Sequence, residues 1–155
     1  MLDFLLFLSK KEKEIVDLVY KANFKFEENT PLCLLGEKFF GFVKNRQKVV
    51  VICTDNAKIK GGHFLRRINH NEDMGQTGIY IRRALRHESV HIAQHCNNGD
   101  LIELDTKRKL KIHPYKLDAL NGSTKISGKR EQEYQAYMIE DKPKIIISAL
   151  EKYCF

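Results

Sequence analysis

The sequence predicts an α+β protein: one domain in which helices surround a small, mostly antiparallel sheet. Its 155 residues, 43% of them hydrophobic and 30% charged, suit one soluble domain with a buried core. Several segments repeat apolar residues at helical spacing. Two runs rich in β-branched or aromatic residues, 38–43 and 48–53, are separated by four polar residues, which is typical of a hairpin.

The N-terminal part is predicted to contain a helix and this hairpin. Ser9 and Glu12 form the S-x-x-E pattern of a capping box, and the apolar residues that follow indicate an amphipathic helix over 10–22. The apolar start of the chain, residues 1–8, is too short to span a membrane and lacks the features of a signal peptide, so we interpret it as core.

The C-terminal part is predicted to be mainly helical. Glycines in 56–79 indicate a loop or short strand, and the alternation of Thr77, Ile79 and Ile81 suggests an edge strand at 76–81 beside which a substrate strand could pair. Residues 80–96 contain neither glycine nor proline and predict a helix. Two further helices are expected, one over 129–140 and one beginning at Pro143.

The helix at 80–96 contains the motif His87-Glu88-Ser89-Val90-His91, or H-E-x-x-H. Residues four apart lie about 40° apart around a helix and about 6 Å along it, so both imidazoles can face one metal ion. Glu88 lies beside them, where it can accept a proton from a metal-bound water. This is the arrangement of zinc proteases. On the same helix Arg82 and Arg86 fall on the opposite side, which predicts that they lie in solvent.

A catalytic zinc site needs a third protein ligand and one open position. His95 is too far along the helix from His87, about 12 Å, to share an ion with it. The helix at 129–140 offers Glu133 as the preferred candidate and Glu131 as the next. Less favoured candidates are Glu140, Glu103 and Asp105.

Residues 87–94, His-Glu-Ser-Val-His-Ile-Ala-Gln, resemble the H-E-x-x-H-x-x-Q signature of small gluzincin-type zinc metallopeptidases. Residues 131–136 are similar to the downstream segment from which that family takes its glutamate ligand. The resemblance implies a metallopeptidase-like domain over 1–155, with a zincin-like core at about 76–155 after the helix and hairpin at about 1–60. It also implies one Zn²⁺ held by His87, His91 and Glu133, with Glu88 as the catalytic base.

Hydrolysis of a peptide bond by a zinc-activated water is therefore the favoured function, with a peptide or protein as substrate. Such a reaction also needs a donor for the developing oxyanion. The candidates are His113, Tyr115, Tyr134 and Tyr137, whereas His63 and His70 are interpreted as loop residues.

Two other functions compete with this one. Residues 56–116 hold 12 basic and 6 acidic side chains, which accounts for nearly all of the net charge of +7. This segment could attract an acidic or nucleic-acid-associated partner, with phosphate bound by a patch of arginines and lysines. That patch comprises Arg82, Arg83, Arg86, Lys107, Arg108, Lys109 and Lys111. The other alternative is a metal-binding module without catalysis.

The four cysteines, Cys33, Cys53, Cys96 and Cys154, form no C-x-x-C pair. We therefore expect free, buried thiols in a reducing compartment. With no membrane-spanning run, the sequence predicts a cytoplasmic protein without a membrane partner.

Overall fold

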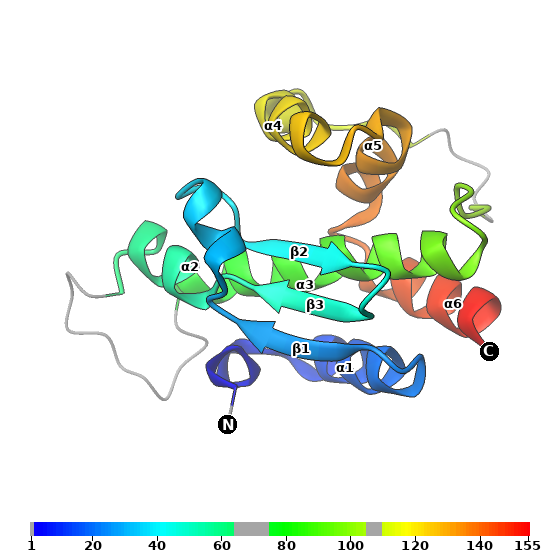
Figure 1. Ribbon diagram of the computed structural model, residues 1–155, viewed down its shortest axis with the longest axis horizontal. Coiled ribbons are helices and arrows are strands. Elements are labelled where there is room, and N and C mark those ends of the chain that lie inside the picture. The colour runs from blue at the N-terminus through cyan, green and yellow to red at the C-terminus, as the bar shows by residue number, and fades with distance from the viewer. Residues whose placement is uncertain (1, 64–74, 105–109) are drawn as a thin grey trace.

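The long helix α3 (Gly75–Cys96) packs against the sheet and contacts helices α1, α2, α5 and α6 (Figure 1). A computed structural model describes residues 2–63, 75–104 and 110–155 as one α+β domain. Around α3 are 3₁₀ helices η1 (Asp3–Phe7), η2 (Pro31–Leu35) and η3 (Pro114–Lys116), α-helices α1 (Lys10–Lys21), α2 (Thr54–Lys60), α4 (Leu117–Ser127), α5 (Arg130–Ile139) and α6 (Pro143–Cys154), and strands β1 (Lys25–Glu28), β2 (Gly41–Lys44) and β3 (Val49–Ile52).

The sheet has three strands in the order β1-β3-β2. The predicted hairpin is confirmed, because β2 pairs antiparallel with β3 and Gly41 lies opposite Ile52. The expectation of a mostly antiparallel sheet is wrong for the other pair, since β1 runs parallel to β3 with Lys25 opposite Val49. The chain leaves β1, passes through η2 and enters the sheet again on the far side of β3, and this crossover makes the first pair parallel.

The predicted edge strand at 76–81 is helical, because α3 begins at Gly75. Thr77 and Ile81, four residues apart, are fully buried, whereas Ile79 is partly exposed. The buried positions therefore follow the helical period, and the six residues 76–81 are too few to distinguish strand alternation from helical spacing. α4 was also not expected from the sequence.

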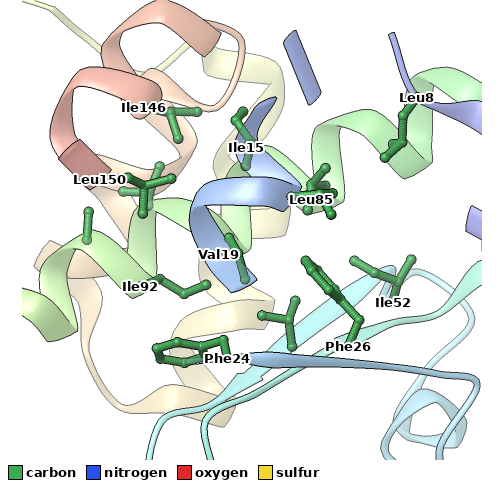
Figure 2. Packing of buried hydrophobic residues seen from close by; sticks show 14 of the residues in the cluster. Leu8, Ile15, Val19, Phe24, Phe26, Ile52, Leu85, Ile92, Ile146 and Leu150 are labelled. Carbon is green, nitrogen blue, oxygen red and sulfur yellow. The ribbon is translucent and has the colours of Figure 1, made fainter. Parts of the chain in front are cut away.

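The core lies where α1, α3 and α6 meet one face of the sheet (Figure 2). Ile15 and Val19 of α1 face Leu85 and Ile92 of α3, and all four are fully buried. The residues that complete this packing are Phe24, Phe26, Ile52, Ile146 and Leu150. Because the core surrounds α3 on several sides, the helix that carries the H-E-x-x-H motif is held rigidly.

Arg82 and Arg86 do not lie in solvent as predicted. Both pair with the buried carboxylate of Glu12 on α1, at 3.8 and 3.5 Å, and Arg82 also donates to the carbonyl of Phe7. The hydroxyl of Ser9 donates to Glu12 as well, at 2.5 Å, in place of capping the backbone of α1. A buried acid needs such partners, and the arginines provide them from the side of α3 that a helical wheel assigns to water.

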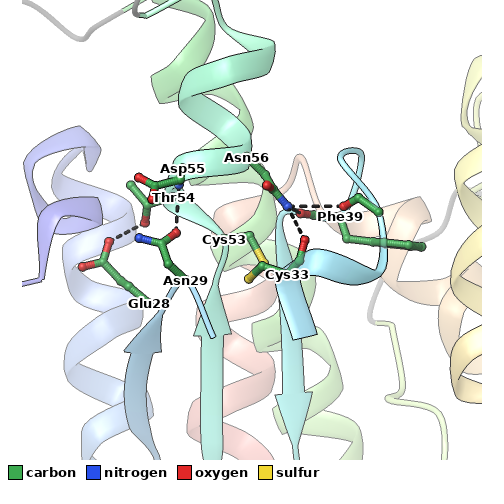
Figure 3. The surroundings of a disulfide bond; sticks show 9 residues. Glu28, Asn29, Cys33, Phe39, Cys53, Thr54, Asp55 and Asn56 are labelled. Carbon is green, nitrogen blue, oxygen red and sulfur yellow. Dashed lines mark hydrogen bonds between the residues drawn. A yellow bond between two sulfur atoms is a disulfide. The ribbon is translucent and has the colours of Figure 1, made fainter. Parts of the chain in front are cut away.

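All four cysteines are paired, so the prediction of free thiols is wrong. Cys33 of η2 is bonded to Cys53 at the end of β3 (Figure 3), and Cys96 at the end of α3 is bonded to Cys154 of α6. The sulfur atoms meet only through the fold, because 20 and 58 positions separate the partners along the chain. Disulfides persist in oxidising compartments, so these bonds favour a non-cytoplasmic location over the predicted cytoplasmic one.

Among the described residues, no helix is both long enough and apolar enough to span a membrane.

Candidate metal centre

Three side chains from two helices converge in the interior. His87 and His91 lie one turn apart on α3, and the Nε2 atoms of their rings are 3.3 Å apart. Glu133 of α5 faces both, with Oε1 3.1 Å from His87 Nε2 and Oε2 3.1 Å from His91 Nε2. Ala136 of α5 is fully buried, and its small side chain allows α5 to pack closely on α3. The three ligand atoms could hold a metal ion.

The hydrogen bonds around His91 determine which of its nitrogens carries the proton. The amide N–H of Ile102 donates to Gln135 Oε1, and Gln135 Nε2 donates back to the Ile102 carbonyl, which sets the orientation of this side chain. Gln94 Nε2 then donates to the same Gln135 oxygen, so Gln94 Oε1 faces His91 Nδ1 at 2.9 Å. His91 Nδ1 must therefore donate, and the lone pair of Nε2 points to the centre.

His87 has a matching partner on its outer side. Its Nδ1 lies 2.9 Å from Oε2 of Glu140, a buried carboxylate that accepts this proton. Lys116 Nζ, 2.8 Å from the other oxygen of Glu140, holds that carboxylate in place. A carboxylate behind a ligating histidine is a common feature of metal sites, because it orients the ring and increases its basicity.

Two imidazole lone pairs and a carboxylate thus point at one another. With no cation or added proton between them, three acceptors at 3.1–3.3 Å repel one another. Tetrahedral zinc with bonds of about 2.0–2.2 Å separates its ligand atoms by roughly 3.3–3.5 Å, and the Nε2 atoms of His87 and His91 are 3.3 Å apart. The donor set therefore fits a small divalent cation such as zinc.

A proton competes with a metal ion for the lone pairs of His87 and Glu133. Burial disfavours the charged form of His87, yet its hydrogen bonds to Glu133 and Glu140 outweigh burial and raise its pKa well above 6.5. Burial would also raise the pKa of Glu133, but hydrogen bonds and charge from the two histidines lower it. In the absence of metal, a proton on His87 compensates the carboxylate.

Glu88 lies beside the three ligands without joining them. It is 7% exposed, and its carboxylate makes no hydrogen bond to the part of the chain that the structure describes. Burial raises the pKa of Glu88, an effect that the charges of His87 and His91 oppose. The first residue of β2, Gly41, leaves room for it, since a Cβ there would be 3.0 Å from Glu88 Cγ.

The centre opens into a cleft lined in part by residues of β2, α3, α4 and α5. Two chambers meet at Gly41, Glu88 and Ser123. One, of about 340 Å³, is termed the polar chamber and is lined in part by Asn45, His95, Ser127, Lys129 and Gln132. The other, of about 200 Å³, is termed the aromatic chamber and is lined in part by Phe39, Phe40, Tyr80, Tyr115, Ala119 and Tyr137.

Comparison with known families gives a match along almost the entire chain. The model described as "Domain of unknown function (DUF8637)" matches residues 4–155. The chain belongs to the DUF8637 family. No curated protein and no solved structure matches the chain significantly. The description of the family assigns no function to it, so the chemistry of this DUF8637 protein has to be inferred from its own residues.

The structure separates the candidate ligands of this DUF8637 domain. Glu133 lies at the centre, Glu131 is exposed, and Glu103 is exposed and paired with Lys152. Glu140 contacts His87 on the side away from the centre. Asp105 lies outside the described residues.

Of the four suggested oxyanion donors, Tyr115 and Tyr137 line the aromatic chamber beside Glu88. Tyr137 packs its ring against His87, but its hydroxyl donates to the carbonyl of Ala119. Tyr134 accepts from the amide of Ile112, and His113 and Tyr115 are exposed neighbours. Of the two histidines assigned to loops, His63 follows α2 and contacts Phe7, and His70 lies outside the described residues.

Sequence reasoning missed the residues that support the ligands. Gln94 stands three positions after His91, as in the H-E-x-x-H-x-x-Q signature, so its position was a usable signal. The role of Gln135 and the contact of Gly41 with Glu88 have no local signal, because the partner of each is at least 33 residues away along the chain.

Proposed function

We propose that the chain is a zinc-dependent peptidase in which His87, His91 and Glu133 hold the ion and Glu88 is the general base. The observation that carries this proposal is the convergence of His87, His91 and Glu133 beside the carboxylate of Glu88, which faces a cleft and accepts no hydrogen bond from the described residues. A purely structural metal site would need neither the carboxylate nor the cleft.

Bound zinc would supply Lewis acidity, which polarises a substrate carbonyl and lowers the pKa of a coordinated water. The role of Glu88 is to accept the proton of the attacking water and later to deliver it to the leaving amine. Its raised pKa suits this exchange, because a base with a pKa nearer to neutral both accepts and returns a proton readily. Glu140 and Gln94 keep the ligand nitrogens directed at the centre.

The position of β2 favours a peptide as substrate. β2 is an edge strand, and its outer side pairs with no other strand among the described ranges. Gly41, Phe42 and Val43 of this strand line the polar chamber next to Glu88. An extended peptide could add to this edge by main-chain hydrogen bonds, which would bring one of its peptide bonds to the centre. The edge of β2 takes the role of substrate-pairing strand that the sequence suggested for residues 76–81, which are helical.

The test compares zinc content and hydrolysis in four proteins purified without a histidine tag. The wild type should bind one zinc per chain and hydrolyse fluorogenic peptides, and Glu88→Gln should keep the zinc and lose hydrolysis by at least ~100-fold. Glu133→Gln should lose zinc, whereas Glu131→Gln, two residues away and exposed, is the matched control and should retain both properties. Full hydrolysis by Glu88→Gln would refute its role as the base.

The two alternatives predict other outcomes. A non-catalytic metal module would bind zinc in the wild type and in Glu88→Gln without hydrolysis by either. A nucleic-acid-binding protein would lose affinity steeply with salt. That function has less support, because Arg82 and Arg86 are paired with Glu12, and Arg83 is paired with Asp141 at 3.1 Å. Lys107, Arg108 and Lys109 lie outside the described residues, and Lys111 is exposed.

A further inference from the structure

We infer that the aromatic chamber selects the substrate: it binds a bulky, uncharged side chain next to the scissile bond and excludes acidic ones. This inference rests on the proposed peptidase function. The chamber borders Glu88 and His87, so a side chain that occupies it belongs to a residue close to the bond being cleaved.

The size of the chamber limits its occupant. Its volume of about 200 Å³ is below the ~300–1,000 Å³ of sites that enclose a whole small molecule. One large side chain fits, and several residues do not. The rings of Phe40 and Tyr80, stacked with centroids 5.1 Å apart, form one wall, and Tyr137 contributes to the other. Aromatic walls gain most from an apolar or aromatic occupant.

The walls are held in place before any substrate arrives. Asn56 Nδ2 donates to the carbonyls of Cys33 and Phe39, both at 2.9 Å, and the Cys33–Cys53 disulfide ties the same segment to the end of β3 (Figure 3). The carbonyl of Phe40 accepts from the amide of Cys53 at 2.8 Å. On the opposite wall, the hydroxyl groups of Tyr137 and Ser123 form a hydrogen bond, with the two oxygens 2.5 Å apart. A preformed pocket binds more tightly because little ordering remains to be done.

The cations at this chamber are already neutralised, which decides against an acidic occupant. Lys116 Nζ lies 2.8 Å from Glu140 and 2.9 Å from Asp141, and Arg83 pairs with Asp141 at 3.1 Å. Glu88 also lines the chamber, so a carboxylate placed there would meet its negative charge in a partly desolvated site. The net charge of +7 therefore does not select an acidic residue at this position.

Ala119 is the residue that sets the width of the chamber. It lies on the exposed side of α4 and lines the chamber with a single methyl group. A larger side chain at this position would occupy the space from the solvent side, without entering the protein core. Leu117 provides a matched control on the same helix, because it is 44% exposed and does not line either chamber.

The experiment measures selectivity in two ways with the full-length, zinc-loaded protein. Cleavage sites are mapped by mass spectrometry in a peptide library in which each position flanking the cleaved bond varies among Phe, Leu, Ala, Asp and Lys. Binding of fluorescent peptides that contain Phe or Ala at the selected position is measured with the Glu88→Gln protein, in which hydrolysis does not interfere. Each measurement is repeated with Ala119→Trp and with Leu117→Trp.

We expect Phe and Leu to be enriched at one of the two flanking positions and Asp to be excluded from it. Ala119→Trp should reduce the Phe-to-Ala ratio at least ~10-fold in both measurements, and Leu117→Trp should leave it unchanged. Cleavage without an apolar preference, a preference for Asp, or an unchanged ratio in Ala119→Trp would overturn the inference while the proposed function stands. If wild type hydrolyses no peptide yet the Glu88→Gln protein binds Phe peptides selectively, the peptidase fails and the chamber assignment stands.

Discussion

Replacing Gly41 by alanine tests whether this strand residue and Glu88 are in contact. The φ angle of Gly41 is not in the left-handed region, so alanine introduces no backbone strain. Its Cβ would lie 3.0 Å from Glu88 Cγ, 3.3 Å from Glu88 Oε1 and 3.4 Å from the carbonyl of Val51. The first distance is too short for two carbon atoms, so the carboxylate must move.

The magnitude follows from two opposing effects. Overpacking of a well-packed site costs about 1–3 kcal/mol. Alanine restricts the unfolded chain and recovers about 0.4–1 kcal/mol of this. At the middle of these ranges Gly41→Ala should lower the free energy of unfolding by about 1.3 kcal/mol. In a Glu88→Ala background the two closest atoms are absent, so the overpacking cost should vanish and Gly41→Ala should instead stabilise the protein by about 0.4–1 kcal/mol.

The assay is a double-mutant cycle by urea unfolding at one fixed zinc concentration. We expect a coupling free energy of about 1–3 kcal/mol between Gly41→Ala and Glu88→Ala, because only the overpacking cost differs between the two backgrounds. The control cycle uses Gly122→Ala, where a Cβ meets no atom within 4 Å, and should be additive. If the Gly41 cycle is also additive to within about 0.5 kcal/mol, the two residues are not in contact and the proposed placement of the base is wrong. Because the proposed base is displaced, Gly41→Ala alone should slow peptide hydrolysis ~10–100-fold.

Four further outcomes are expected. Zinc at 100 times its Kd should raise the free energy of unfolding by about 2.7 kcal/mol, and a thermal scan of Glu133→Gln should show no such gain. The raised pKa of His87 means that protonation of this side chain stabilises the folded, metal-free protein. The full contribution to the free energy of unfolding is present below about pH 6.5, and it is lost as the pH rises through the pKa of His87 in the folded state. Unfolding in EDTA across pH 6–10 should show this loss, while zinc affinity rises over the same range because the metal displaces the proton; a metal-free stability independent of pH would contradict it. Gln94→Leu should weaken zinc binding ~10–100-fold in competition with a chromogenic chelator, with Gln94→Glu closer to wild type because it still accepts from His91. Cys96→Ser should lower the free energy of unfolding by about 4 kcal/mol in non-reducing buffer, because it opens the loop of 58 residues that the Cys96–Cys154 disulfide closes. If the wild type has the same unfolding midpoint with and without reductant, this disulfide does not form.

Local features were predictable from the sequence because their causes are local. The hairpin of β2 and β3 needs only two apolar runs and a short connection, and it is present. The helix that carries His87 and His91 was expected over 80–96 and extends to Gly75 at its start. The spacing of four residues on this helix is sufficient to bring the two rings together, whatever the remainder of the chain does.

Non-local features were missed or left open for the opposite reason. Thr77, Ile79 and Ile81 alternate as in a strand, and Thr77 and Ile81 also have the spacing of one helical turn. Only packing against the core determined that the segment is helical. The parallel partner of β1 and the two disulfides join segments that are distant in sequence, so no local pattern encodes them. Arg86 was assigned to solvent because the wheel of one helix does not show the buried Glu12 of another.

The metal centre combines both kinds of information. Helical geometry alone aligns His87 and His91 and places Glu88 beside them. The choice of Glu133 over Glu131 required the packing of α5 on α3, since a carboxylate two residues away points to a different side of the same helix. The proton on His91 depends on a chain of amides that ends at the backbone of Ile102. The pair of histidines is thus encoded by the sequence of one helix. The third candidate ligand, the orientation of the rings and the access to the cleft arise only when distant segments pack together.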